Sequence, residues 1–240
     1  GEKQYAVLYA INGAAKDYFQ EEFLKETAAA KSARDYLASR GMLSETVREF
    51  EIGFAPNTSD GLARFLAQKG FKMPDIERAG LVFKTERGTY WDRFRGRIMF
   101  PIMNAFGKTV GFTGRVLPVP ADSASVATSA KGAALAKEGA HHADASGMAL
   151  AKYVNSPETP IFNKSKLLFG LHKTKGAIRE LKTAVLVEGQ MDMLMAWQDG
   201  VKNVVASSGT ALTKEHLQGL QRAAATLVLF FDADEAGQAA

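Results

Sequence analysis

The last quarter of the sequence contains three short apolar runs that alternate with stretches of helical character. The runs cover residues 184–187, 201–206 and 226–231, and the helical stretches extend to about Gln198 and from Thr213 to about Ala223. Apolar strands without polar alternation, separated by helices, are typical of a parallel sheet with both faces covered and with right-handed crossovers. This segment therefore predicts an α/β unit.

Acidic residues follow the first and third of these apolar runs. Glu188 and Asp192 come after the first, and Asp232 and Asp234 come after the third. Because the carboxyl ends of parallel strands form the functional edge of such a sheet, the four carboxylates converge if the two strands are neighbours. A cluster of carboxylates suits Mg2+ and phosphoryl or nucleotidyl transfer. Each acid alone has a simpler explanation, as a helix N-terminal residue or a turn residue.

The first half of the chain has a different, mixed character. Residues 5–70 are predicted to be largely helical, with helices over 14–24 and 30–39, a loop around 53–61 and a short helix over 62–69. Short β-like runs follow at 81–83, 97–102 and 110–112, where arginines stand close to aromatic residues. These runs predict a small antiparallel or mixed sheet with a basic and aromatic face.

An alanine-rich segment interrupts the chain at residues 118–151. Twelve of its 34 residues are alanine and it has no aromatic residue, so it is predicted to be an inserted, weakly structured loop. The predicted organisation is an N-terminal subdomain formed by residues 1–117 and 152–182, the insert, and the α/β unit over 183–240.

Charge is distributed unevenly along the 240 residues, although the net charge is only +4. Residues 84–115 and 152–182 each carry +5, whereas residues 183–240 carry −4. This pattern favours a polyanion-binding surface beside a carboxylate site, with a merely solvated surface as the alternative. The absence of cysteine excludes a thiolate zinc site within this sequence. No apolar run approaches the length of a membrane span, so we expect a soluble protein without a membrane partner.

Several motifs resemble the polymerase core of bacterial DnaG-type DNA primases. In the α/β unit, Val187-Glu188-Gly189-Gln190-Met191-Asp192 is similar to the EGYMD element of the Toprim fold. Residues 206–213 resemble the family's ASLGTALT element and residues 231–237 its FDGDxAG element. Upstream similarities cover almost the whole chain outside the insert, at residues 36–41, 52–56, 92–102, 111–117 and 152–164.

The resemblance implies an α/β protein in which a mixed α+β N-terminal subdomain precedes a partial Toprim subdomain. It implies a DNA-directed RNA polymerase that makes short primers on single-stranded DNA by metal-dependent nucleotidyl transfer. By motif position, Glu188, Asp232 and Asp234 are the expected catalytic residues, and with Asp192 they are the expected ligands of Mg2+ or Mn2+. The residues expected to hold template, hybrid or nucleotide are Arg40, Arg93, Arg95, Arg115, Lys152, Tyr153, Asn155 and Lys164.

The same resemblance implies partners and further domains. The family's partners are single-stranded DNA, NTPs, the RNA–DNA hybrid and, through a C-terminal domain, the replicative helicase. Its zinc belongs to a cysteine-bearing N-terminal domain that this sequence does not contain. We expect a cytoplasmic monomer acting at the replication fork, truncated here and therefore poorly active by itself.

The residues leave alternatives open for the function of the chain and for four side chains. The chain could be a non-catalytic module that binds single-stranded nucleic acid, or a Toprim nuclease or topoisomerase. Tyr153 and Phe94 could stack on bases, although aromatic residues beside strands belong more often to a core. Arg93 and Arg97 are also typical of ordinary surface cations.

Overall fold

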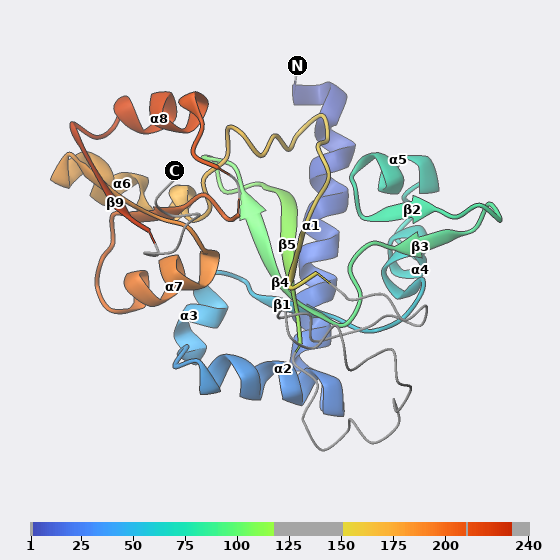
Figure 1. Cartoon of the computed structure of the whole chain (residues 1–240). Helices are drawn as coiled ribbons and strands as arrows, with labels where there is room; N and C mark the ends of the chain where they lie inside the picture. Colours follow the sequence, from blue (N-terminus) through green and yellow to red (C-terminus); the bar gives the residue numbers. More distant parts are fainter. Residues whose placement is uncertain (1, 118–150, 210, 232–240) are drawn as a thin grey trace, which may run out of the picture.

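The computed structural model describes residues 2–117, 151–209 and 211–231. The described residues form three sheets, of which the two larger ones lie side by side and the third is a two-stranded hairpin; the long helix α1 lies behind the first (Figure 1). The helices are α1 (Glu2–Leu24), α2 (Ala28–Ser39), α3 (Ser44–Glu49), α4 (Gly61–Gln68), α5 (Met73–Arg78), α6 (Leu171–Leu181), α7 (Gln190–Gln198) and α8 (Lys214–Gln221). The strands are β1 (Gly53–Ala55), β2 (Val82–Lys84), β3 (Tyr90–Asp92), β4 (Arg97–Met103), β5 (Thr109–Val116), β6 (Tyr153–Asn155), β7 (Thr183–Val187), β8 (Val204–Ala206) and β9 (Thr226–Phe230).

The first sheet is antiparallel, with strand order β1-β4-β5-β6. Every residue of β4 is buried, because both faces of this strand are covered. Met99 packs with the helices on one face, whereas Ile98 and Phe100 belong to a core shared with the second sheet. The predicted antiparallel sheet is confirmed, and its central strand is apolar because neither of its faces meets water.

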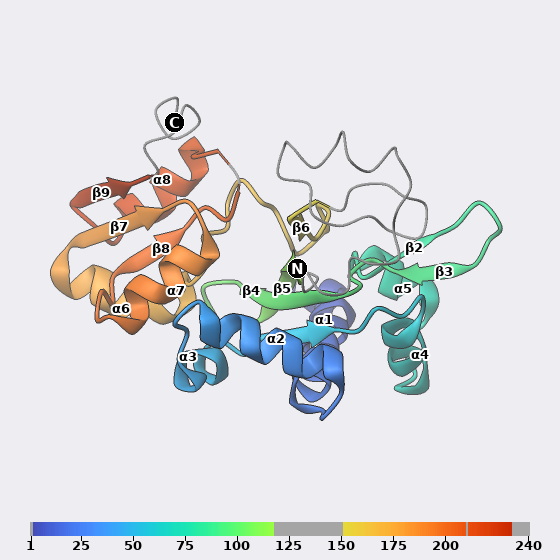
Figure 2. The same ribbon diagram turned by 60° about the horizontal axis from the view of Figure 1, so that its bottom comes forward.

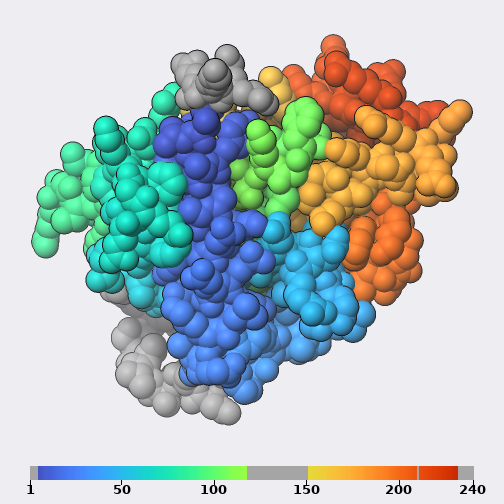
Figure 3. Space-filling view, turned by 180° about the vertical axis from the view of Figure 1, so that it is seen from behind, coloured from blue at the N-terminus to red at the C-terminus, as the bar shows by residue number. Residues whose placement is uncertain are grey.

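Helix α1 crosses the back of this sheet. Leu8, Ile11, Ala15 and Phe19 are fully buried at three- and four-residue spacing, which directs one stripe of the helix onto the strands. Figure 3 shows the outer side of α1 running down the middle of the rear face, between α4 and α5 on one side and the C-terminal half on the other.

The helix approaches β1 closely because Gly53 has no side chain. A Cβ atom at Gly53 would lie 2.6 Å from the carbonyl carbon of Phe19, which is backbone and cannot rotate away. Gly53→Ala is therefore expected to force α1 outward and to lower the free energy of unfolding by about 3 kcal/mol. Urea unfolding followed by circular dichroism measures this loss.

Gly13→Ala is the matched control for the Gly53 substitution. Gly13 lies in the middle of α1, and a Cβ atom there would meet nothing within 4 Å. Alanine is a better helix former than glycine, so this variant should be more stable by up to about 1 kcal/mol. Equal effects of the two substitutions would contradict the close approach at Gly53.

The second sheet is parallel, with strand order β8-β7-β9. Its central strand packs Ala184 and Leu186 against α6 and α8 on one face, and Val187 against α7 on the other. Figure 2 shows β7 between its two neighbours, with helices on either side of the sheet. The predicted parallel α/β unit is confirmed, and the structure shows that its first and third strands are neighbours, which the sequence left open.

Coverage of this sheet is less complete than predicted. Val228 and Phe230 of β9 are 43% and 74% exposed, although they follow the apolar pattern of a buried strand. The reason is that α6 and α7 lie over β7 and β8, and no described helix crosses β9 on the α7 side.

The two sheets share one hydrophobic core. Phe50 and Phe54 from the first half pack in the same cluster as Met193 and Val204 from the second. Gln198 at the end of α7 adds polar contacts, since its side chain accepts from the Leu43 backbone N–H at 2.8 Å and donates to the carbonyl of Gly41, and is within hydrogen-bond distance of Thr46. The halves are thus held in a fixed relation.

Several local predictions were wrong or incomplete. Residues 53–55, expected in a loop, form β1, and the short elements α3, α5 and β3 were not predicted. Helix α6 packs on β7 and β8 of the parallel sheet, although it lies before residue 183, where the predicted α/β unit begins. The predicted insert lies outside the described residues except for Ala151, and the subdomain boundaries stay a prediction. None of the described helices is long and apolar enough to cross a membrane.

Candidate nucleic-acid and metal site

Glu188 and Asp192 lie at the carboxyl end of the central parallel strand. Glu188 directly follows β7 and is half-buried, whereas Asp192 is exposed in the first turn of α7. Gly189 lies between them, and a Cβ atom there would lie 2.5 Å from Oδ2 of Asp192, a contact that the exposed Asp192 side chain can relieve by rotating. The carboxylate of Asp192 therefore folds back over the strand end, where the helix N-terminus also favours negative charge.

Strand β9 ends beside β7, with Phe230 opposite Val187. Strand β9 therefore ends at the same edge of the sheet as Glu188. Asp232 and Asp234 themselves lie outside the described residues. Within residues 2–117, 151–209 and 211–231, no three metal-ligating side chains are grouped together. The four-carboxylate site stays a prediction, and its two described members have the oxygen donors that Mg2+ prefers.

The turn after β8 faces the same edge. Ser208 and Gly209 both have left-handed backbones, with φ of 55° and 75°, and the Ser208 N–H donates to the Glu188 carbonyl at 2.9 Å. A serine in this conformation is strained by an amount that surrounding contacts must offset. At Gly209 a Cβ atom would meet nothing within 4 Å, so it is the positive φ of the turn that favours glycine there.

Arg115 occupies the middle of an aromatic cage at the end of β5. Its guanidinium lies 5.0 Å from the ring centre of Tyr36 and 5.2 Å from that of Tyr153, and it donates to the Tyr153 hydroxyl at 2.7 Å. Burial raises the pKa of Tyr153, and the hydrogen bond from Arg115 only partly offsets this. The guanidinium is therefore oriented by two rings, with its charge unpaired by any carboxylate among the described ion pairs.

Asn155 connects the antiparallel sheet to the edge of the parallel one. Its side-chain Nδ2 donates to the Ser208 carbonyl at 3.4 Å, and its Oδ1 is buried with no hydrogen-bond partner among the described residues. Lys164 lines the same narrow space, with Ser207 and Ser208. Two predicted binding residues are thus brought to the loop that contacts Glu188.

Arg93 and Arg95 belong to a second group, on the β2–β3 hairpin side. Arg93 is half-buried, donates from Nε to the Gly80 carbonyl at 3.0 Å and lies 6.0 Å from the ring centre of Phe83. Arg95 lies 5.1 Å above the ring of Trp91. Burial lowers the pKa of Arg93, which nevertheless stays a cation at neutral pH.

The remaining predicted cations, Arg40 and Lys152, are exposed. Arg40 is the C-cap residue of α2, one turn after Tyr36 of the aromatic cage. The carbonyl of Lys152 accepts from the Val116 N–H at 3.0 Å, which places it beside the end of β5. Both therefore border the Arg115 group, and their roles stay a prediction.

The structure decides between the alternatives left open for Phe94 and Arg97, and it places both side chains in the interior. Phe94, considered as a base-stacking residue, is 1% exposed and packs edge-on against Phe112 in the core. Arg97, considered as a surface cation, is 3% exposed and donates to the carbonyls of Gly114 and Ala151. Both side chains point inward because β4 and its approach are covered on both faces.

Sequence reasoning missed the aromatic partners of the arginines. Tyr36 and Trp91 supply the rings over which Arg115 and Arg95 lie, and only proximity in the fold shows this. It also missed Asp92, which is 2% exposed and accepts from the backbone N–H groups of Leu62 and Ala63 at 2.8 and 2.9 Å. Asp92, at the end of strand β3, thereby caps the first turn of helix α4.

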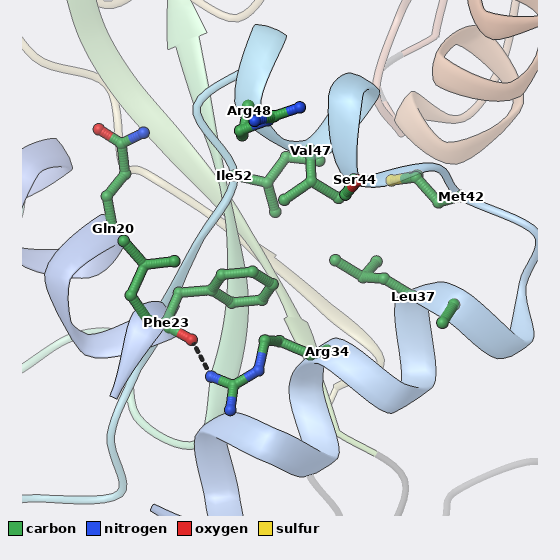
Figure 4. A pocket seen from close by; sticks show the side chains of 11 residues that line it. Gln20, Phe23, Arg34, Leu37, Met42, Ser44, Val47, Arg48 and Ile52 are labelled. Atoms are coloured by element: carbon green, nitrogen blue, oxygen red, sulfur yellow. Dashed lines mark hydrogen bonds between the residues drawn. The ribbon is translucent and has the colours of Figure 1, made fainter. Parts of the chain in front are cut away.

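A separate cavity of about 420 Å3 lies between α1, α2 and α3. Figure 4 shows Phe23, Leu37 and Ile52 pointing into it, with Arg34 at one rim bonded to the Phe23 carbonyl. None of the described residues that line it is acidic, and its wall is largely apolar. The lining offers no carboxylate for a metal, and it includes none of the residues predicted for the candidate site.

Comparisons with known proteins agree with the residue patterns. Residues 18–175 match the family described as DNA primase catalytic core, N-terminal domain, and residues 185–240 match the Toprim-like family. The DNA primase of Geobacillus stearothermophilus is 39% identical over 219 residues, covering 91% of this chain and 32% of that protein. The DNA primase of Deinococcus radiodurans is 40% identical over 239 residues, covering 99% of this chain and 36% of that protein. The chain thus spans about a third of the length of these relatives.

Solved structures give the same result for the fold. The RNA polymerase domain of Mycobacterium tuberculosis primase DnaG matches with a TM-score of 0.78 and 35% identity, over 97% of this chain and 68% of that one. A DnaG primase catalytic domain bound to single-stranded DNA matches with a TM-score of 0.77 and 32% identity, over 100% of this chain and 65% of that one. Because the first family match alone covers well over half of the residues, this chain belongs to the DNA primase catalytic core family.

Proposed function

We propose that this chain is the core of an RNA polymerase that makes short RNA primers on single-stranded DNA. The observation that carries the proposal is the contact between Asn155 and the Ser208 loop. This contact joins the strand that bears the Arg115 cage to the sheet edge that bears Glu188. A cationic surface for a nucleic acid and an acidic edge for a metal thus meet at one place, as nucleotidyl transfer requires.

The chain's own residues have separate roles in this proposal. Glu188 and Asp192, with Asp232 and Asp234, hold Mg2+ or Mn2+, which neutralises charge on the phosphates and aligns them when it is bound. Arg115 and Lys164 hold phosphate oxygens on the side of the antiparallel sheet. Asn155 offers its buried Oδ1 as an acceptor for a hydroxyl or amino group of the nucleotide or the nascent strand.

The remaining partners are proposed at the level of the whole protein. The template is single-stranded DNA, the substrates are NTPs and the product is an RNA–DNA hybrid. In the longer protein, the replicative helicase contacts a C-terminal domain, and zinc belongs to an N-terminal domain. The protein acts as a monomer in the cytoplasm, at the replication fork.

Template-dependent synthesis tests the proposal. With a single-stranded DNA template, NTPs and Mn2+ or Mg2+, this chain or a longer protein that contains it should yield short RNA products. Products should require both template and metal. Tight template binding without any NTP incorporation, even in a protein of the relatives' full length, would favour the non-catalytic module. DNA nicking or relaxation instead would favour a nuclease or topoisomerase.

The salt dependence of DNA binding tests the cationic surface separately. The proposed set holds the six cations Arg40, Arg93, Arg95, Arg115, Lys152 and Lys164. If each neutralises one phosphate, the logarithm of the binding constant should fall with the logarithm of salt with a slope of about −4, that is six times −0.7. Fluorescence anisotropy of a labelled oligothymidylate measures the slope.

Single substitutions calibrate that slope. Arg115→Ala should make it shallower by about 0.7, as expected for one lost phosphate contact. Lys69→Ala is the matched control, because Lys69 is an exposed cation at the end of α4, where it lies over Phe65. A slope near zero in the unaltered chain would remove the cationic surface from the proposal.

A further inference from the structure

Trp91 on the β2–β3 hairpin is a large aromatic side chain left partly open to solvent. It is 41% exposed, and its cross-strand partner Phe83 meets it edge-on with ring centres 6.4 Å apart. The hairpin forms a two-stranded sheet of its own and projects from the body on the side away from the parallel sheet (Figures 1 and 2). The indole of Trp91 therefore has surface available for contact with a ligand.

Two guanidinium groups stand on the same side of the hairpin as these rings. Arg95 lies 5.1 Å from the centre of Trp91, and Arg93 lies 6.0 Å from the centre of Phe83. The one carboxylate within β3, that of Asp92, points to the other side, where it is bonded to the first turn of α4. The exposed ring is therefore bordered by cations and not by an acid of its own strand.

Backbone contacts connect this face to the Arg115 cage. Gly96, next to Arg95, accepts from the Leu117 N–H at 3.4 Å, and the Val116 N–H donates to the carbonyl of Lys152. Arg115 pairs with Tyr153 across β5 and β6. The hairpin aromatics thus continue the cationic surface instead of forming an isolated patch.

We propose that Trp91 is a stacking platform for an unpaired base of single-stranded DNA, with Arg95 and Arg93 holding the flanking phosphates. This inference rests on the proposed function and adds an element to it, namely contact with the bases of the strand. Every base has a flat π-face, so a stacking ring binds DNA without selecting its sequence, and adjacent cations bind the backbone at the same time. An exposed ring between cations fits a polyanion with bases better than an apolar protein surface.

The chain contains only two tryptophans, which makes the test specific. Trp197 of α7 packs edge-on against Phe50 with ring centres 5.0 Å apart, on the far half of the molecule. In a Trp197→Phe variant, all tryptophan emission comes from Trp91. Oligothymidylate should quench that emission, because a stacked base quenches indole fluorescence. An abasic deoxyribose-phosphate oligomer with the same number of phosphates should leave it nearly unchanged.

The reciprocal variant and the affinities complete the experiment. Trp91→Phe leaves only Trp197, whose emission should not respond to either oligomer. Trp91→Ala should weaken oligothymidylate binding about fivefold or more, while affinity for the abasic oligomer changes less than about twofold. Phe106→Ala is the matched control, since Phe106 is an 83% exposed aromatic on a different hairpin turn. Trp91→Leu keeps an apolar contact with Phe83, so its melting temperature should equal that of the unaltered protein. Its affinity for oligothymidylate should nevertheless fall as in Trp91→Ala.

The outcomes distinguish a failure of the stacking platform from a failure of the proposed function. If anisotropy shows that the unaltered chain binds oligothymidylate, but Trp91 substitutions change neither affinity nor quenching, the stacking platform is overturned and the proposed function stands. Equal quenching by the abasic oligomer also overturns stacking, because Trp91 would then be sensing phosphates alone. If the unaltered chain binds no single-stranded DNA, both fail.

Discussion

Replacing Glu188 with glutamine is expected to lower template-dependent primer synthesis by on the order of a hundredfold to a thousandfold. Glu188 directly follows strand β7, and its backbone carbonyl accepts a hydrogen bond from the Ser208 N–H. The backbone of Glu188 is therefore fixed by the strand before it and by the turn after β8. Glutamine keeps the shape of the side chain but removes its charge and replaces one acceptor oxygen with an NH2 donor. The loss therefore reports on charge at the sheet edge. NTP incorporation into RNA products, in this chain or in a longer protein that contains it, is the measurement.

DNA affinity and a matched acid make the result interpretable. Glu188→Gln should leave the anisotropy-measured affinity for oligothymidylate nearly unchanged, because the cations proposed to bind DNA lie elsewhere. Binding of Mn2+, followed by electron paramagnetic resonance, should weaken together with synthesis. Glu180→Gln is the control, since Glu180 is an exposed acid near the end of α6. Synthesis within about tenfold of the unaltered protein would contradict a role for Glu188 in catalysis.

The parallel unit could be predicted well because its signals are local. Apolar runs such as Thr226–Phe230 and Thr183–Val187 carry no polar alternation, and an acid follows each within two residues in the sequence. That pattern has few solutions other than parallel strands with helical crossovers. The adjacency of β7 and β9, on which the convergence of acids depends, was left open by the sequence and is shown by the register of Val187 and Phe230.

Short elements of the first half escaped prediction because their stability is not local. Strand β1 contains only Gly53, Phe54 and Ala55. It forms because α1 packs closely against Gly53 and because β4 supplies its hydrogen-bond partners. Helices α3 and α5 have six residues each, too few for a hydrophobic period to be recognised. Tertiary contacts therefore decide the structure at these positions.

The candidate site, too, could be predicted from the sequence only in part. Motif positions supplied the predicted cations and acids, with Arg95 among them, but they did not show that Arg97 is buried whereas Arg95 lies over an exposed ring. The two are separated by one residue, and only the covering of β4 by other elements makes the difference. The caging of Arg115 by Tyr36 joins residues 79 positions apart, so no local pattern could have predicted it.

Two buried groups are expected to give stability opposite dependences on pH. Burial raises the pKa of Asp92 from 3.8 to about 6, although hydrogen bonds from Leu62 and Ala63 work against this shift. The folded protein therefore takes up this proton before the unfolded chain does. Stability from Asp92 is fully present below about pH 4 and is lost as pH rises through about 6.

His172 on α6 behaves in the opposite sense. Burial lowers its pKa from 6.5 to about 4, with the neighbouring Lys173 adding to the effect. Neither ring nitrogen has a hydrogen-bond partner among the described residues, and the ring lies edge-on to Phe50. The unfolded chain therefore binds this proton first. Stability from a neutral His172 is present above about pH 6.5 and is lost as pH falls toward 4.

Because the two windows overlap, the unaltered protein should show a flatter stability profile between pH 4 and 6.5 than either variant. A shift of about two pKa units corresponds to roughly 3 kcal/mol for Asp92. The effect for His172 is on the order of 2 kcal/mol, smaller because its ring keeps some contact with water. In Asp92→Asn, stability should fall steeply as pH falls, since only the His172 dependence remains. In His172→Phe, stability should instead increase as pH falls. Urea unfolding at each pH gives these slopes, which do not depend on the constant cost of each substitution. Parallel profiles for all three proteins would mean that neither group changes its pKa on folding.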